Sequence, residues 1–100
     1  MSKSTLTQQL TELIMAKPVA ATDLQQAALL TLDAMANAMA GRISEPGSIL
    51  LRWAGATEAT DAERNAFLLG SLTHILETDD LHRASVVHPG CVVVPAAWAV

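Results

Sequence analysis

The sequence predicts an all-α fold, a helical bundle, on three observations. Apolar side chains recur every three or four residues in several segments, which is the spacing of one face of a helix. Three segments begin with a threonine that is followed three residues later by glutamine or glutamate, the pattern of a capping box. A long stretch in the first half is rich in Ala, Leu and Met, which are good helix formers.

The first helix is predicted over residues 4–17. Thr5 and Gln8 form its capping box, and Pro18 ends it because a proline pushes the preceding residue out of the helical region. We expect its apolar face to pack in the ordinary way against other helices, and the alternative is a helix that binds a partner. This face consists of Leu6, Leu10, Leu13 and Ile14.

The second helix is predicted over residues 23–40, with Thr22 and Gln25 as its capping box and Gly41 as its stop. It is apolar nearly all round, which is typical of a buried helix. A lone chain of 100 residues has hardly enough material to surround such a helix. Its small alanines would let neighbouring helices come close. One apolar stripe consists of Leu24, Ala28, Leu32, Met35 and Met39.

The middle of the chain is predicted to hold one undecided apolar segment and one helix. Residues 48–54 are short and apolar, and fit a helix or a strand equally well. A helix from Thr60 to about Leu76 starts with a capping box to Glu63. Gly70 costs this helix about 1 kcal/mol relative to Ala, so we expect another backbone or a ligand to come close there.

Residues 77–90 are predicted to form no regular element. Val92 to Val94 could start a strand, whereas Pro95 is typical of the first turn of a helix. The sequence reaches Val100 without a stop signal for that helix. We therefore expect residues 1–100 to be a single domain that is part of a larger helical fold.

Composition also indicates that the chain is part of a larger assembly, and it excludes several classes of function. Hydrophobic residues make up 51% of the chain and charged residues 16%, against about 25% charged in an average soluble domain. We therefore expect a homo-oligomer, or a second polypeptide that covers the apolar surface. The net charge of −4 and the lack of a basic cluster argue against a nucleic-acid partner.

Membrane and secretory classes are also disfavoured. There is no apolar run of 18 residues that could span a bilayer, and the first residues lack the apolar core of a signal peptide. Cys91 is the only cysteine, so no internal disulfide can form and a reducing compartment is favoured. The expected location is the cytoplasm.

The candidate site lies between Gly70 and Gly90. This stretch holds all three histidines and three of the ten acidic residues. Histidine and carboxylate are the usual general acids and bases, so the cluster predicts proton transfer. The alternative without chemistry is a polar loop with capping acids and exposed histidines. The residues are His74, Glu77, Asp79, Asp80, His82 and His88.

A metal site is a further alternative for the same stretch. Five of its side chains are of types that bind transition metals, although their spacing matches no recognised metal motif. These are His74, Asp79, Asp80, His82 and His88.

Three segments together resemble the N-terminal part of the MmgE/PrpD family. They are Gly-Ser-Leu-Thr-His-Ile-Leu-Glu-Thr-Asp-Asp-Leu-His, then Val-Val-His-Pro-Gly, and Val-Pro-Ala-Ala-Trp-Ala. The alanine-rich second helix, ending in Ala-Gly, is also similar, so the resemblance extends over most of residues 6–100. The family includes 2-methylcitrate dehydratase, cis-aconitate decarboxylase and iminodisuccinate epimerase.

The resemblance implies a large all-α domain joined to a smaller α/β lid, and commonly a dimer. It implies action on small di- or tricarboxylic acids by dehydration, decarboxylation or epimerisation, through a carbanion beside a carboxylate. It also implies that no metal or organic cofactor takes part.

The family's Asp-x-Asp-Asp motif falls on residues 77–80, and the histidine of its His-Pro segment falls on His88. The resemblance therefore implies that His88 transfers the proton, with Asp79, Asp80 or Glu77 orienting it or sharing the proton. His74 and His82 are the candidates for substrate binding.

Two departures from the family pattern matter. Glu77 stands where the motif has aspartate, and a misplacement of about an ångström can cost about a hundredfold in rate. Cationic residues for an anionic substrate are few, and the family's substrate-holding lysines lie outside this sequence. We therefore expect an enzyme segment with half a site, or else a non-catalytic helical assembly module derived from the family. The available cations are Lys3, Lys17, Arg42, Arg52, Arg64 and Arg83.

Overall fold

Five helices make up the regular structure of the protein. The computed structural model describes residues 4–56 and 61–100, and within them only one isolated β-bridge, His82 with Val87, departs from an all-helical fold. The prediction of an all-α fold is therefore confirmed. The helices are α1 (Leu6–Ala16), α2 (Ala21–Arg42), α3 (Glu45–Gly55), α4 (Ala62–His74) and α5 (Gly90–Ala99).

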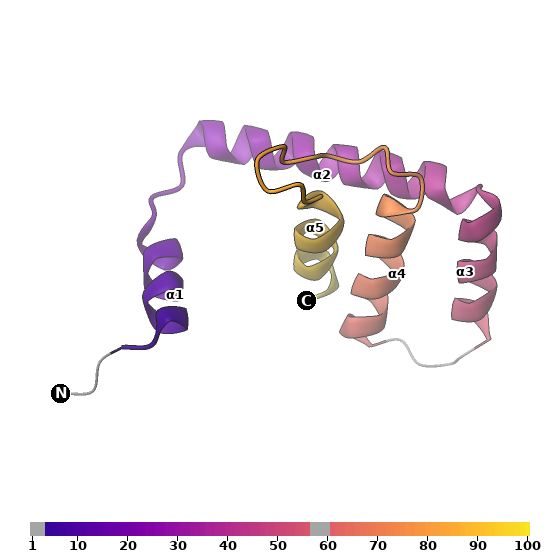
Figure 1. The fold of residues 1–100 in the computed structure, drawn as a ribbon, viewed down its shortest axis with the longest axis horizontal. Coiled ribbons are helices and arrows are strands. Elements are labelled where there is room, and N and C mark those ends of the chain that lie inside the picture. The colour runs from indigo at the N-terminus through magenta and orange to yellow at the C-terminus, as the bar shows by residue number, and fades with distance from the viewer. Residues whose placement is uncertain (1–3, 57–60) are drawn as a thin grey trace.

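The long helix α2 is the element on which the others are arranged. Figure 1 shows α3, α4 and α5 side by side on one side of α2, with the segment between α4 and α5 running back along α2. Helix α4 lies in the middle and packs against α2, α3 and α5. The end of α4 and the start of α5 therefore meet close to α2.

The core of this arrangement is built from small residues. The buried face of α2 consists of Ala34, Ala38 and Gly41, which recur at helical spacing. Thr73 of α4 is completely buried against this face, and its hydroxyl donates to the carbonyl oxygens of Ala34 (3.3 Å) and Leu69 (2.8 Å). Small side chains on α2 let the backbone of α4 come close enough for the first of these bonds.

The expectation that α2 is buried nearly all round is therefore wrong for the described chain. Leu24 is 62% exposed, Leu32 is 66% exposed and Met39 is 73% exposed. The pattern misled because α2 is apolar on several sides, so hydrophobicity alone could not select the face on which α4 packs. Close packing selected the side with the smallest residues.

The predicted ends of α2 are also wrong. The helix starts at Ala21, and the carboxylate of Asp23 accepts a hydrogen bond from the Ala20 backbone N–H at 3.0 Å, in place of a cap by Thr22. Gly41 does not end the helix but lies inside its last turn, buried against α4. A Cβ added at Gly41 would overlap the Leu72 carbonyl oxygen. Gly41 therefore allows the backbone of α4 to come close to α2, and it does not end the helix.

The structure settles the undecided segment at 48–54 as part of helix α3. Ser44 caps this helix by accepting from the Gly47 backbone N–H at 3.1 Å. Helix α4 begins at Ala62, with Asp61 as its cap accepting from the Arg64 backbone N–H at 2.7 Å. The cap predicted at Thr60 lies outside the described residues. Helix α4 ends at His74, two residues before the predicted end.

The last helix starts earlier than predicted. Helix α5 begins at Gly90 and carries Pro95 in its interior, so the alternative of a strand at 92–94 is wrong. Pro95 has no N–H for the carbonyl of Cys91, four residues before it. A Cβ at Gly70 would lie 2.5 Å from that carbonyl oxygen, which confirms the expected close backbone approach at Gly70.

Helix α1 stands apart from the other helices. Its capping box is confirmed, because Thr5 Oγ1 accepts from the Gln8 backbone N–H at 3.2 Å and Gln8 Oε1 accepts from the Thr5 N–H at 2.7 Å. In the described part of the chain, however, α1 has no buried residue and packs against no other helix (Figure 1). The expectation of ordinary packing is wrong for this helix.

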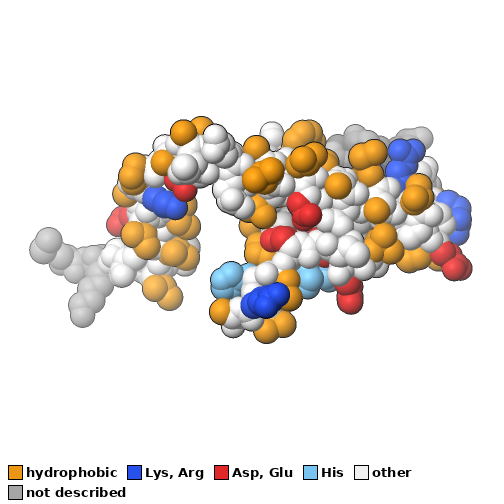
Figure 2. All heavy atoms as spheres, turned by 90° about the horizontal axis from the view of Figure 1, so that it is seen from above, with side chains coloured by type: hydrophobic (Ala, Val, Ile, Leu, Met, Phe, Trp, Pro, Cys, Tyr) orange, Lys and Arg blue, Asp and Glu red, His pale blue; other side chains and the backbone are white. Residues whose placement is uncertain are grey.

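The molecule exposes far more apolar surface than a compact domain of its size. Its radius of gyration is 16.3 Å, against about 13 Å for a compact chain of 100 residues. Figure 2 shows hydrophobic side chains spread along the face seen from above. Among the described residues, no helix combines the length and the hydropathy that crossing a bilayer would require.

Candidate functional site

The candidate site forms where the end of α4, the following loop and the start of α5 meet. His74 is the last residue of α4, Asp79 and His88 belong to the loop, and Cys91 lies in the first turn of α5. These side chains come from three separate pieces of backbone. The folding of the loop therefore decides which of the predicted residues meet.

Asp79 is the centre of the cluster. Its side chain is completely buried, and its two carboxylate oxygens lie 3.0 and 3.2 Å from Nδ1 of His74. Within the described chain, its ion-pair partners are His74 and His88. A buried carboxylate loses its hydration and is stable only if it is paired and hydrogen-bonded. For Asp79, the two histidines provide the compensating interactions.

His88 approaches Asp79 from the other side. Its Nδ1 lies 3.3 Å from Asp79 Oδ1, at ion-pair distance but not aligned for a hydrogen bond. This nitrogen is buried and has no hydrogen-bond partner in the described structure. The rings of His74 and His88 meet edge to face with centroids 4.6 Å apart. Two imidazoles thus converge on one buried carboxylate.

A tight turn after α4 brings Asp79 under His74. The Glu77 backbone N–H donates to the His74 carbonyl oxygen at 2.8 Å, and Glu77 has a φ of 53°, in the left-handed region. Thr78 then donates through its hydroxyl to Asn37 Oδ1 on α2 at 2.6 Å. This anchor to α2 fixes the turn, and the next residue points inward.

Asp80 lies outside the histidine cluster and holds the start of α5. Its Oδ1 accepts from the Gly90 backbone N–H at 2.8 Å, at the helix end where a carboxylate is favoured by the helix dipole. A Cβ on Gly90 would overlap this carboxylate. Asp80 and Gly90 therefore set the position of α5 and, through it, of His88.

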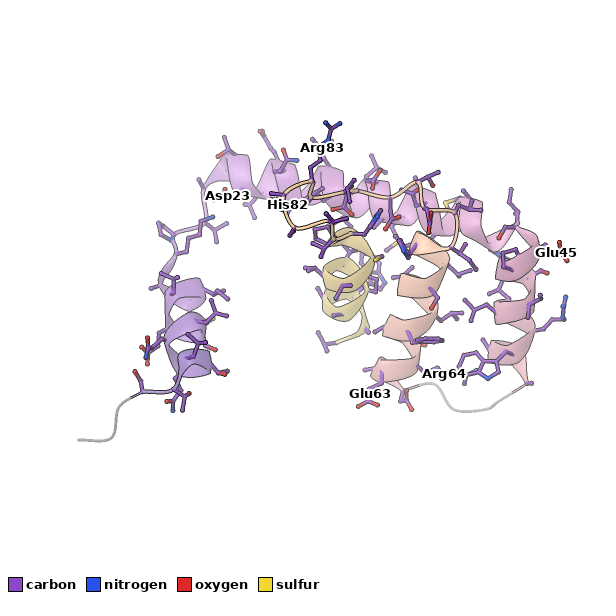
Figure 3. The ribbon with its side chains drawn as sticks, viewed as in Figure 1. Asp23, Glu45, Glu63, Arg64, His82 and Arg83 are labelled. Carbon is purple, nitrogen blue, oxygen red and sulfur yellow. The ribbon has the colours of Figure 1, made fainter. Side chains whose placement is uncertain are left out.

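The structure does not bring Glu77 and His82 into the cluster. The side chain of Glu77 is exposed. His82 is also exposed, and its Nδ1 pairs with Ser85 Oγ at 2.7 Å inside its own loop. Figure 3 shows His82 and the neighbouring Arg83 on the loop that runs along α2, with Arg83 pointing away from the helices below.

Cys91 is a member of the cluster that the sequence analysis did not include. Its thiol donates to the His88 carbonyl oxygen at 3.1 Å. Burial raises the pKa of this thiol, and the negative charge of Asp79 raises it further. The signal in the sequence was its place three residues after His88, directly after the His-Pro-Gly segment.

A family model, the MmgE/PrpD N-terminal domain, matches residues 8–100. The chain belongs to the MmgE/PrpD family. The searches of curated proteins and of solved structures found no match. The resemblance that the motifs predicted is thus confirmed.

An open pocket gives this MmgE/PrpD domain access to the cluster from solvent. Its volume is about 390 Å³, and His74 and Cys91 form part of its wall. The remaining wall is mostly apolar, with Phe67 at its edge. Its full lining is Ala66, Phe67, Gly70, Ser71, His74, Cys91 and Val92. A small molecule in this pocket would lie beside His74 and Cys91.

Proposed function

We propose that the chain supplies the acid–base part of a cofactor-independent lyase or isomerase that acts on small di- or tricarboxylic acids. The observation that carries this proposal is the fully buried Asp79 carboxylate between His74 and His88. A carboxylate at ion-pair distance stabilises the protonated form of an imidazole, which is what a proton-transfer histidine needs.

His88 is the proton-transfer group in this proposal. Its Nδ1 faces Asp79, which leaves Nε2 as the nitrogen that can exchange a proton with a substrate. Removal of a proton beside a carboxylate would give a carbanion, from which water loss, decarboxylation or reprotonation on the other face can follow. His74, which borders the pocket, is positioned for substrate contact.

The substrate's own carboxylates need cationic or amide donors, and we propose that a second polypeptide supplies them. Arg83 points away from the cluster (Figure 3). Arg64 lies 5.5 Å from the centre of the Trp53 ring and donates to the Ala54 carbonyl oxygen. Arg64 therefore contacts α3, in keeping with a site that is completed from outside.

The test is to express the chain together with the remaining part of an MmgE/PrpD enzyme and to measure turnover of 2-methylcitrate and cis-aconitate. We expect turnover only with both polypeptides present. His88→Asn should lower kcat by about 10²–10⁴-fold, because that is the usual contribution of a general acid or base.

Asp79→Asn tests the role of the buried carboxylate. Its matched control is Glu45→Gln, which also replaces a carboxylate by an amide. Glu45 is exposed at the start of α3, at the other end of the molecule from α1 (Figure 3). Asp79→Asn should lower kcat, and Glu45→Gln should leave it unchanged. Turnover by the chain alone would contradict the half-site, and full activity of His88→Asn would contradict the role of His88.

A second candidate function is a non-catalytic helical module that pairs with a second copy of itself. The observation that favours it is α1, an amphipathic helix whose apolar face meets no other helix in the described chain. A module of this kind would self-associate without any turnover in the two-polypeptide assay.

A further inference from the structure

We propose that His74, Asp79 and Cys91 form a binding site for a thiophilic divalent transition metal, of which Zn²⁺ is the type, with His88 as the fourth ligand. The proposal goes beyond the proposed reaction, in which no metal takes part. It depends only on the geometry of the cluster, and it can be tested without any substrate.

The donor set is the first support. His74, Asp79 and Cys91 each offer one ligand atom, and these atoms all lie within 4.8 Å of one another. Imidazole nitrogen, carboxylate oxygen and thiolate sulfur are the three donor types that zinc accepts in proteins. Bonds of about 2.0–2.3 Å in a tetrahedron place ligand atoms about 3.3–3.8 Å apart, so a contraction of about 1 Å brings these three atoms to ligand spacing. His88 is outside this group of three.

His88 provides a second, independent support. Its Nδ1 is buried, has no hydrogen-bond partner in the described structure, and lies 3.3 Å from Asp79 Oδ1. That distance already equals the spacing of two ligands on one tetrahedral ion. An unsatisfied buried nitrogen is costly, and a metal ion between it and the carboxylate would satisfy both.

The surroundings suit a cation. The Asp79 carboxylate is fully buried, and its ion-pair partners within the described residues are the two histidines, so no lysine or arginine already neutralises it. The pocket of about 390 Å³ beside His74 and Cys91 gives the ion a path from solvent. Both the charge and the access that a metal needs are therefore present.

Metal and protons compete for this site. Binding requires that the Cys91 thiol release its proton to solvent and that one nitrogen of each imidazole be unprotonated. A bound ion would occupy the same carboxylate and imidazoles that the proposed reaction uses. We therefore expect Zn²⁺ to act as an inhibitor of the completed enzyme and not as its cofactor.

The experiment is a titration of the purified full chain with Co²⁺ and then Zn²⁺ under reducing conditions. We expect one equivalent of Co²⁺ to bind with the visible absorption of a tetrahedral site and the near-ultraviolet charge-transfer band of a cobalt–thiolate bond. One equivalent of Zn²⁺ should displace it. Absence of the charge-transfer band in the wild-type chain would overturn the proposal.

Three variants assign the ligands. Cys91→Ser should abolish the charge-transfer band and weaken binding by at least about tenfold. His88→Gln should keep the band but weaken binding, and unchanged affinity would overturn the assignment of His88. The matched control is His82→Gln, because His82 is exposed and pairs with Ser85. It should bind like the wild type, and an equal loss in this control would contradict the site.

Circular dichroism of each variant separates loss of the site from loss of the fold. Wild-type helicity with lost metal binding in Cys91→Ser supports the proposal. Unchanged affinity for Co²⁺ in that variant contradicts it. Because no substrate is present, failure of this titration leaves the proposed acid–base function untouched, and failure of the turnover assay leaves the metal site untouched.

Discussion

Cys91 shows how strongly one buried carboxylate affects its neighbours. Burial raises the pKa of the thiol above its ordinary value of 9.0, and the charges of Asp79 and Asp80 raise it further. The folded chain therefore disfavours the thiolate more than the unfolded chain does. This contribution to stability is fully present below the ordinary pKa and is lost as the pH rises through the folded value.

Removing the charge of Asp79 should make Cys91 more reactive. In Asp79→Asn we expect the thiol pKa to fall, so that alkylation by iodoacetamide at pH 8 becomes several-fold faster and the midpoint of its pH profile moves down. The rate is measured by mass spectrometry of the intact chain. Glu77→Gln is the control, because Glu77 is exposed and is not among the causes of the shift. An unchanged midpoint in Asp79→Asn would contradict the electrostatic explanation.

The crossing of α2 and α4 depends on the close approach of their backbones. Its contact consists of small residues on α2 and the buried pair Leu72 and Thr73 on α4. At Gly41 the carbonyl of Leu72 fills the space that a side chain would need, and Ile75 Cγ2 would lie 2.9 Å from an added Cβ. The crossing therefore depends on a missing side chain.

A pair of glycine variants tests this dependence. Gly41→Ala should destabilise the fold by about 1–3 kcal/mol, because the inserted methyl group forces the two helices apart. Gly55→Ala is the matched control: it lies at the end of α3 with nothing within 4 Å of an added Cβ, and it should stabilise by about 0.5–1 kcal/mol. Urea unfolding followed by circular dichroism gives both values. Similar effects of the two substitutions would show that close approach at Gly41 is not what matters.

The molecule as a whole has more accessible surface than a compact monomer of its mass. The accessible surface is 7815 Å², against roughly 5,400 Å² for a compact monomer of this mass. The difference of about 2,400 Å² exceeds the roughly 800 Å² that each partner buries in a standard interface. Leu6 and Leu13 on α1 are 82% and 70% exposed, and Leu32 on α2 is 66% exposed. An exposed apolar surface of this size is typical of a site of contact with another protein.

We therefore expect the chain to self-associate at micromolar concentration when it is purified alone. Leu13→Glu on the apolar face of α1 should shift sedimentation velocity profiles toward the monomer, because it places a charge in the contact. Gln9→Glu is the matched control, since it adds the same charge to an exposed residue outside the apolar face and should leave association unchanged. A sharp monomer of the wild-type chain would argue against the oligomerisation module.

The order and type of the helices could be read from the sequence because local interactions decide them. Capping boxes, helix formers and apolar spacing act within about four residues, so α1 was predicted nearly to its ends. The same reasoning misplaced the ends of α2 and α5, where a glycine and a proline serve contacts with α4. A local pattern does not contain those contacts.

For the candidate site, too, the sequence determined one part and the tertiary structure decided the rest. The sequence by itself determined that the histidines and three acids fall within one short stretch, and its motifs determined the family. Only the tertiary structure decided that His74, Asp79, His88 and Cys91 meet, that Asp80 holds the Gly90 N–H, and that His82 faces solvent. The physical reason is that this choice depends on a loop pinned to α2 by Thr78 and Asn37, 41 residues apart along the chain, and on backbones that approach only where side chains are missing.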